Sequence, residues 1–274
     1  MDSPKLPLII DPAQLLPLLG SKDLLIIDLC QTAVYQQFHV PGAIHVNPAE
    51  LVSGVPPATG KLPPLAHLQA LFSRIGLSSA KHVVVYDDEG GGWAGRMIWT
   101  LDVVGHRRYS YLDGGIHAWR NEGFPLQTEP VAPQHGPFEF TADMSVNASL
   151  EEVLASLDDP GTVVWDARSA EEYHGTRKSA QRNGHIPGAI NLDWLHTMDR
   201  NNNLRLLPLP RLQAMLDRLG ITVDKKVITH CQTHHRSGLT YLIGKALGYN
   251  IRAYDGSWSE WGNHPDTPID PRPN

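Results

Sequence analysis

The chain alternates short apolar runs with stretches in which apolar residues recur at helical spacing. Four of the apolar runs are residues 24–27, 82–86, 163–165 and 227–229, and each is followed by polar residues. Short runs of this kind, bounded by polar loops, are typical of strands that are buried on both faces of a parallel sheet. The alternation of such strands with amphipathic helices predicts an α/β fold.

The order of these patterns occurs twice along the chain. The run that ends in Asp28 has a counterpart that ends in Asp166, and the His-x-Pro-Gly-Ala-Ile segment at residues 39–44 recurs at residues 185–190. The first two segments are 138 residues apart (28 to 166) and the second two are 146 apart (42 to 188), which places an insertion within residues 175–182. A repeated order of elements indicates one α/β unit that is used twice.

Residues 129–137 separate the two copies and are polar, rich in proline and without periodicity. This composition is typical of a semi-extended linker. We therefore expect two domains, residues 1–126 and 146–274, joined by a linker at residues 127–145. A length of 274 residues fits two domains of ordinary size.

Composition and charge restrict the expected partners and the compartment. With a net charge of −6 the chain lacks the basic character of nucleic-acid-binding proteins, so we expect no nucleic-acid partner. No apolar stretch approaches the ~20 residues of a membrane span, and the N-terminus has no signal-peptide pattern, so we expect no membrane association. The two cysteines, Cys30 and Cys231, form no disulfide framework. A nucleophilic thiol needs a reducing compartment, which makes the cytoplasm the expected location.

Cys231 stands where the fourth apolar run ends and the next helical pattern begins. Backbone N–H groups at such a turn and at a helix N-terminus carry partial positive charge, and Arg236 adds a full one. Each of these charges favours the thiolate over the thiol, so we expect Cys231 to have a lowered pKa and to act as a nucleophile. The alternative is a buried structural cysteine, and a polar loop with two histidines is a poor place to bury one.

The loop Cys231-Gln232-Thr233-His234-His235-Arg236 resembles the active-site loop of the rhodaneses, the thiosulfate sulfurtransferases, in the form that bacterial tandem-domain members carry. The resemblance covers essentially the whole chain. Further segments of the second half match signatures of the family: Asp166-Ala167-Arg168, residues 184–189 and residues 255–261. The resemblance implies an α/β protein of two tandem rhodanese-like domains, each a mostly parallel central sheet flanked by helices.

The resemblance also assigns roles to residues of the second half. Cys231 is implied to be the catalytic nucleophile. Substrate is implied to be bound by loop residues and by a tryptophan on the wall of the site: Gln232, Thr233, His234, His235, Arg236 and Trp194. Structural support of the site is implied for four residues: Asp166, Arg168, Asp255 and Ser257. No metal and no organic cofactor is expected.

The chemistry implied by the family has two steps. The cysteine thiolate takes a sulfur from thiosulfate and releases sulfite, and a thiophilic acceptor such as cyanide then removes the sulfur from the resulting persulfide. The expected partners are a small anionic sulfur donor and a thiophilic acceptor, and a protein sulfur acceptor is also compatible with the chemistry. Gln232 and Thr233 stand where some family members have arginine and lysine, which leaves the donor preference open.

The first half has no counterpart of the cysteine loop. Aligned by strand, loop and helix, it has Asp88 at the position of Cys231 and Trp93 at the position of Arg236. The Asp-Glu-Gly-Gly-Gly sequence there offers neither a nucleophile nor a cation for an anion, so we expect the first domain to be inactive. Cys30 aligns with Arg168 and is expected to be a small apolar filler.

Three other functions stand as alternatives. A cysteine phosphatase with a rhodanese-like fold uses the same nucleophile, but its loop needs five residues between cysteine and arginine, and four stand here. A metal site would use His230, Cys231, His234 and His235, although no second pair of ligands is evident. A binding-only module would not need the cysteine.

The insertion at residues 175–182 carries three basic residues, Arg177, Lys178 and Arg182. Two interpretations are open for them. They either lie near the cysteine loop and attract an anion, or they belong to a solvated surface loop.

Overall fold

The computed structural model describes residues 6–270, which form two compact units. Unit 1 contains the chain up to Leu51, Pro63–Asp143 and Asp199–Leu206. Unit 2 contains Val52–Leu62, Met144–Met198 and the chain from Leu207. Each unit therefore includes one short segment from the other half of the sequence.

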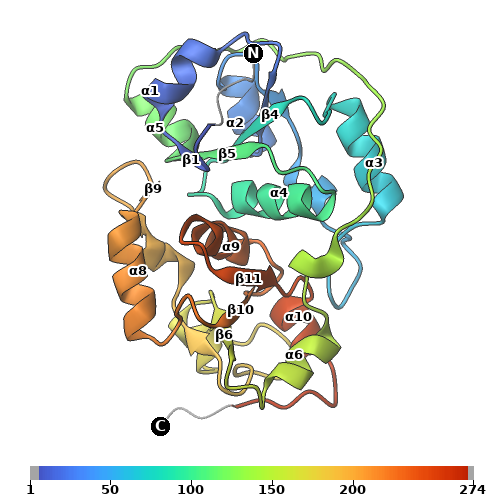
Figure 1. Cartoon of the computed structure of the whole chain (residues 1–274), viewed down its shortest axis with the longest axis vertical. Coiled ribbons are helices and arrows are strands. Elements are labelled where there is room, and N and C mark those ends of the chain that lie inside the picture. The colour runs from blue at the N-terminus through green and yellow to red at the C-terminus, as the bar shows by residue number, and fades with distance from the viewer. Residues whose placement is uncertain (1–5, 271–274) are drawn as a thin grey trace. The chain divides into compact units, whose positions relative to one another are not determined.

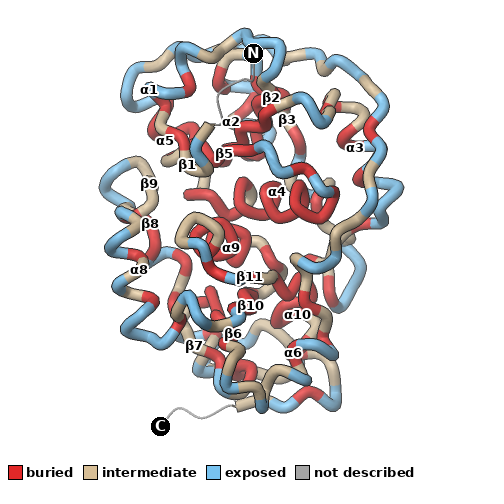
Figure 2. Tube along the Cα trace, viewed as in Figure 1, coloured by how far each residue is buried: buried red, intermediate tan, exposed pale blue. Residues whose placement is uncertain are grey.

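Unit 1 is built on a five-stranded sheet whose described pairings are all parallel. In spatial order its strands are β1 (Ile9–Ile10), β5 (Tyr109–Leu112), β4 (His82–Tyr86), β2 (Leu24–Asp28) and β3 (Ile44–His45). β4 is buried at every position, which explains why its residues from Val83 to Tyr86 are apolar rather than alternating with polar ones (Figure 2).

Helices surround this sheet, and the longest of them, α4, packs against β4 and β5 (Figure 1). The helical segments of unit 1 are α1 (Pro12–Leu15), η1 (Leu16–Leu18), α2 (Thr32–Gln37), η2 (Pro48–Leu51), α3 (Leu65–Arg74), α4 (Gly92–Val103) and α5 (Gly115–Asn121). Residues 130–143 contain neither helix nor strand.

Unit 2 repeats the plan with a four-stranded parallel sheet. In spatial order its strands are β11 (Asn250–Ala253), β10 (Lys226–His230), β6 (Thr162–Asp166) and β7 (Ile190–Asn191). The helical segments are η3 (Met144–Val146), α6 (Leu150–Ser156), α7 (Ala170–Tyr173), η4 (Trp194–Thr197), α8 (Leu209–Arg218), α9 (Arg236–Ala246) and α10 (Ser257–Trp261). Outside the two sheets, two short strands at the ends of the Asp199–Leu206 segment, β8 (Met198–Asp199) and β9 (Arg205–Leu206), pair with each other. The predicted α/β class with mostly parallel sheets is confirmed.

Strand pairing fixes the correspondence between the two units. Asp28 pairs with Tyr86 in unit 1, and Asp166 pairs with His230 in unit 2. The residue after Tyr86 is Asp87, which therefore corresponds to Cys231, the residue after His230. The predicted match of Cys231 with Asp88 is therefore wrong by one residue. The predicted match of Arg236 with Trp93 is wrong by one residue as well, because α9 begins at Arg236 and α4 begins at Gly92. A loop alignment carries no register of its own, whereas hydrogen-bonded strands do.

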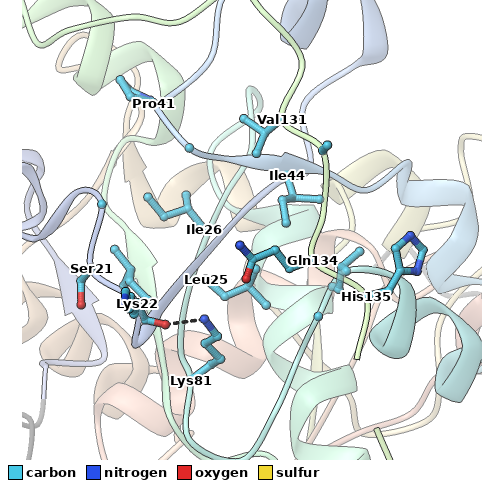
Figure 3. A pocket seen from close by; sticks show the side chains of 16 residues that line it. Ser21, Lys22, Leu25, Ile26, Pro41, Ile44, Lys81, Val131, Gln134 and His135 are labelled. Carbon is cyan, nitrogen blue, oxygen red and sulfur yellow. Dashed lines mark hydrogen bonds between the residues drawn. The ribbon is translucent and has the colours of Figure 1, made fainter. Parts of the chain in front are cut away.

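A cavity of about 670 Å³ lies within unit 1. It is lined by side chains of β2 and β3, among them Leu25, Ile26 and Ile44, and by Gln134 and His135 from the segment after α5 (Figure 3). The loop that follows β4 is not among its lining residues, so this cavity is not the counterpart of the cysteine site. Within residues 6–270, no helix is both long enough and apolar enough to cross a membrane.

Candidate active site

Cys231 lies at the carboxyl end of a central strand and just before a helix. β10 ends at His230 and α9 begins at Arg236, so residues 231–235 form the connection between them. The carboxyl ends of parallel strands are the edge where α/β folds hold their sites. The strand, loop and helix predicted around Cys231 are therefore all present, and α9 packs against β10 and β11 (Figure 1).

The thiol of Cys231 is fully buried, which the sequence analysis did not expect. Burial alone raises the pKa of a thiol, but here it is outweighed by the charge of Arg236, by hydrogen bonds from the hydroxyl and the N–H of Ser237, and by His235, so the pKa of Cys231 is lowered. A polar loop can bury this cysteine because Ser237 donates hydrogen bonds to the sulfur and the charge of Arg236 acts on it. Burial and a favoured thiolate are compatible in this site.

Cys30 provides an internal contrast. It is also buried, within the apolar cluster around β2 and β4. Burial raises the pKa of its thiol well above the ordinary value, and the nearby carboxylates of Asp28, Asp88 and Asp87 raise it further. The two cysteines therefore have opposite electrostatic surroundings.

His234 turns inward and supports the loop. Its backbone has a positive φ of 52°, a left-handed conformation that is uncommon for a residue with a side chain. The buried ring places Nδ1 2.7 Å from Oγ of Ser237, the residue whose hydroxyl also reaches Cys231. His234 thus positions the hydroxyl of Ser237, which donates a hydrogen bond to the thiolate, and its ring does not point into solvent.

The start of α10 is attached to the same loop from the other side. Ser257 Oγ accepts the N–H of Cys231 at 3.3 Å and donates to the carbonyl of Tyr254 at 2.9 Å. The N–H groups of Trp258 and Ser259 donate to the carbonyls of Cys231 and Gln232, both at 2.9 Å. Ser257 therefore lies directly against the cysteine backbone, as expected of a supporting residue.

Arg236 is held by a carboxylate that the sequence analysis did not single out for a role. Its two terminal nitrogens donate to Glu172 at 2.6 and 2.9 Å. Burial raises the pKa of Glu172, but the bond to Arg236 and its charge outweigh burial and lower it, so the pair is ionised. Glu172 also closes the capping box of α7 with Ser169. The Ser-x-x-Glu spacing of that box is a sequence signal for the helix start, but not for the pairing with Arg236.

Asp166 and Arg168 form a buried ion pair beneath the loop. Arg168 Nη2 donates to Asp166 Oδ2 at 2.6 Å and to the carbonyl of Gly184 at 2.8 Å. Its guanidinium also lies 4.3 Å from the ring centroid of Trp258, next to the bonds that α10 makes with Cys231. Asp255, the last of the predicted supporting residues, accepts from Asn147 Nδ2 at 3.2 Å and lies two residues before Ser257.

Gln232, a residue of the loop, and Trp194, which lies beside the loop, make further contacts at the cysteine site. Gln232 Nε2 donates to the carbonyl of Ser179 at 2.8 Å, so the insertion at residues 175–182 does reach the loop. The ring of Trp194 stands edge-on to His235, with centroids 5.7 Å apart.

The basic residues of the insertion have different surroundings. Arg182 donates to the carbonyls of Trp261, His264 and Thr267, so it ties the insertion to the C-terminal segment. Arg177 and Lys178, which precede Arg182 in the insertion, are both exposed. Arg182 is thus a structural residue.

Among residues 6–270 no group of three or more His, Cys, Asp or Glu side chains is arranged to hold a metal ion. Two of the histidines considered as ligands are turned elsewhere: His234 to Ser237, and His230 to Asp166, with Nε2 3.5 Å from Oδ2. Burial is also the main reason that the pKa of His230 is lowered.

The corresponding loop of unit 1 encloses a carboxylate. Asp87 Oδ1 accepts the N–H groups of Glu89, Gly90 and Gly91 at 3.1, 3.1 and 2.8 Å, and Oδ2 accepts that of Ala94 at 3.0 Å. Burial, together with the charge of Glu89, raises the pKa of Asp87 to about 6, although the N–H bonds by themselves lower it. The loop therefore folds into a cradle of N–H donors around an acidic side chain of its own.

These features define a class of protein: two α/β units of one plan, one of which has a thiolate-stabilising cysteine loop. The family model described as the rhodanese-like domain matches residues 11–122 and 149–264, so the chain belongs to the rhodanese-like family. The predicted family is confirmed.

Two curated relatives span nearly the whole chain. The thiosulfate sulfurtransferase of Azotobacter vinelandii is 48% identical over 98% of this chain and 99% of its own, and that of Pseudomonas aeruginosa is 50% identical over 97% of both. Among solved structures, the anaerobic ergothioneine biosynthesis enzyme from Chlorobium limicola, in complex with trimethyl histidine, matches with a TM-score of 0.87. It covers 96% of this chain and 70% of its own at 18% identity, and it supports the fold alone.

Proposed function

We propose that this chain is a thiosulfate sulfurtransferase that works through a persulfide on Cys231. The enzyme transfers sulfane sulfur, as the relatives named above over nearly its whole length indicate. The observation that carries the mechanism is the position of Cys231, a buried cysteine between the end of β10 and the start of α9, where the donors of Ser237 and the charge of Arg236 lower the pKa of its thiol. The donor is thiosulfate or a related anion, and the acceptor is cyanide or another thiophile.

The reaction has two half-reactions. In the first, the Cys231 thiolate attacks the outer sulfur of thiosulfate, the S–S bond of thiosulfate breaks, and sulfite leaves with the electron pair. In the second, cyanide attacks the terminal sulfur of the persulfide, thiocyanate leaves, and the thiolate returns. Each half-reaction conserves charge and needs no oxidant, and the sequence predicts ping-pong kinetics.

The donors of the loop would stabilise the persulfide anion. Asp87 in unit 1 supports this, because it stands at the position of Cys231 and its carboxylate accepts four N–H groups of the corresponding loop. By the correspondence of Asp87 with Cys231, those donors match the N–H groups of residues 233, 234, 235 and 238. An anion on Cys231 would meet the same kind of cradle, preorganised by the turn into α9.

Arg236 would act mainly through the electrostatic effect of its positive charge on the sulfur of Cys231. Both of its terminal nitrogens donate to Glu172, and its side chain is 20% exposed. We therefore assign to Arg236 the stabilisation of the thiolate and of the incoming anion at short range. Gln232, Thr233, His235 and Trp194 would line the substrate position, as their places in or beside the loop support. The buried His234 would instead act through its bond to Ser237.

The phosphatase alternative has less support. Its arginine must present two nitrogens to phosphate oxygens, and those of Arg236 donate to Glu172. The loop also holds four residues between Cys231 and Arg236 rather than five.

We also propose the domain division 1–126, linker 127–145 and 146–274, with the first domain inactive. The carboxylate of Asp87 at the cysteine position supports the lack of activity, since it fills the anion cradle of its own loop. A cytoplasmic location and a protein that accepts the sulfur belong to the same proposal.

Mass spectrometry of the protein incubated with thiosulfate, and then with cyanide, tests the function. We expect one sulfur atom to be added to the peptide that contains Cys231 and to be lost on cyanide with release of thiocyanate. Mercaptopyruvate in a parallel incubation ranks the donors. No sulfur adduct from either donor, together with hydrolysis of an aryl phosphate, would favour the phosphatase.

The two cysteines are expected to differ in their reaction with iodoacetamide. The pH midpoint for alkylation of Cys231 should lie below the ordinary thiol value of about 8.5, because Arg236 and Ser237 outweigh burial. Cys30 should stay unmodified over the same range, since burial raises its pKa. Replacing Arg236 with glutamine should raise the Cys231 midpoint. Peptide mapping after alkylation at a series of pH values measures both, and a Cys231 midpoint above the ordinary value contradicts the assignment.

A further inference from the structure

The segment Val52–Leu62 comes from the first half of the sequence but belongs to unit 2. It forms a closed turn, because the N–H of Ser53 donates to the carbonyl of Lys61 at 2.8 Å and that of Gly54 to the carbonyl of Thr59 at 3.0 Å. Ala58 and Gly60 are buried within it. The segment is therefore an ordered part of the unit that holds Cys231.

Gly60 packs directly on the backbone of the cysteine loop. A Cβ atom at this position would lie 2.0 Å from the carbonyl oxygen of Thr233 and 2.6 Å from its Cα. The φ angle of Gly60 is not in the left-handed region, so an L residue could adopt its backbone. Glycine is needed here for space alone, because the backbone at Gly60 and the backbone at Thr233 are in contact without any side chain between them.

Two further contacts attach the segment to the other side of the loop. The N–H of Leu62 donates to Asp255 Oδ2 at 2.9 Å. Lys61 forms an ion pair with Glu260 of α10, and Glu260 accepts the hydroxyl of Tyr254 at 2.9 Å. α10 is the helix whose first N–H groups donate to the carbonyls of Cys231 and Gln232. The segment thus contacts both the cysteine loop, through Gly60, and α10, through Lys61.

Unit 1 contains the same arrangement, formed by Asp199–Leu206. The N–H of Leu206 donates to Asp113 Oδ1 at 2.9 Å, as that of Leu62 does to Asp255. Arg205, which corresponds to Lys61, pairs with Asp113 and Glu122. The exchanged segment is therefore a repeated element of the fold, and in unit 2 it also packs on the loop that contains the cysteine.

We propose that the 52–62 segment is a positioning element of the catalytic site and that Gly60 is its positioning residue. The contact of Gly60 with Thr233 holds the peptide two residues after Cys231, and so holds the loop N–H groups in the directions that favour the thiolate and the persulfide. The inference rests on the proposed sulfur transfer, with the donors around Cys231 as the groups that are positioned.

Gly60→Ala in the full chain tests this. The added methyl group must displace the carbonyl of Thr233, so we expect persulfide formation from thiosulfate to slow at least tenfold and the alkylation midpoint of Cys231 to rise. Gly136→Ala is the matched control, because its φ is also outside the left-handed region and a Cβ there meets nothing within 4 Å. This control should stay within twofold of the wild type in both measurements.

A charge exchange tests the same element through its ion pair rather than through the packing of Gly60. Lys61→Glu places two carboxylates together and should slow persulfide formation, and Lys61→Glu combined with Glu260→Lys should restore it. Wild-type rate and alkylation midpoint in Gly60→Ala would overturn the proposal, and so would a double variant that is no faster than Lys61→Glu alone. The alkylation midpoint needs no sulfur donor. If the wild type takes up no sulfur, the proposed function fails while the midpoint still reports on positioning.

Discussion

Replacing Cys231 with serine is expected to abolish sulfur uptake from thiosulfate and to lower the rate of thiocyanate formation by roughly 10³-fold or more. The serine hydroxyl is close to the cysteine thiol in shape, so the loop and its bonds to Ser257 and Trp258 should persist. What is lost is the thiolate, because a hydroxyl in the same surroundings does not ionise near neutral pH. The intact mass of the variant after incubation with thiosulfate should equal its mass before.

Cys30→Ala is the control for this experiment. Cys30 lies in the apolar cluster of unit 1 and its thiol has a raised pKa, so its removal should leave sulfur uptake within twofold of the wild type. Persistent uptake in Cys231→Ser would contradict the assignment of the nucleophile. Loss of uptake in Cys30→Ala would show that the second thiol takes part in the transfer.

Asp166→Ala is expected to destabilise the protein by about 3–5 kcal/mol, because it leaves the buried Arg168 without its counter-charge. Both side chains of the pair are fully buried, and the two are joined by bonds from Nε and Nη2 of Arg168. Denaturation by urea measures the loss in free energy of unfolding. Lys226→Ala, which removes a partner from an exposed ion pair with Asp159, should change stability little.

The effect of Asp166→Ala should depend on pH in a defined direction. Burial raises the pKa of Asp166, but Arg168 and His230 outweigh it, so the pKa in the folded protein is below the ordinary value. The ionised carboxylate therefore stabilises the fold above the ordinary pKa of about 4, and this stabilisation is lost as the pH falls through the lowered pKa. The difference between wild type and variant should shrink in acid. A difference that grows as the pH falls would contradict the ion pair as its source.

Much of the fold follows from local patterns of the sequence. The apolar runs that end in Asp28, Tyr86 and His230 are the strands β2, β4 and β10, and each is buried along most of its length. Such patterns can be interpreted locally because a strand buried on both faces has mostly apolar residues in a continuous run, rather than apolar and polar residues in alternation. The same holds for the cysteine loop, since the strand before Cys231 and the helix after it are both visible in the periodicity.

Several features of the site could not be predicted in this way. Glu172 and Arg236 are 64 residues apart, and neither has a neighbouring sequence that names the other as its partner. Gly60 and Thr233 come from different halves of the sequence, and a glycine in a turn gives no sign that a second backbone packs on it. The one-residue shift from Asp88 to Asp87 has the same origin, because only strand pairing defines the register.

The sequence by itself determined the repeated α/β plan, the position of Cys231 between a strand and a helix, and the positive surroundings that favour its thiolate. These depend on residues that are neighbours in the chain, where periodicity and charge act locally. Only the tertiary structure decided that the thiol is buried, that Arg236 is held by Glu172, and that Val52–Leu62 lies against the loop. These depend on contacts between distant segments, and the packing of two backbones or of a buried ion pair is set by the whole fold rather than by either segment.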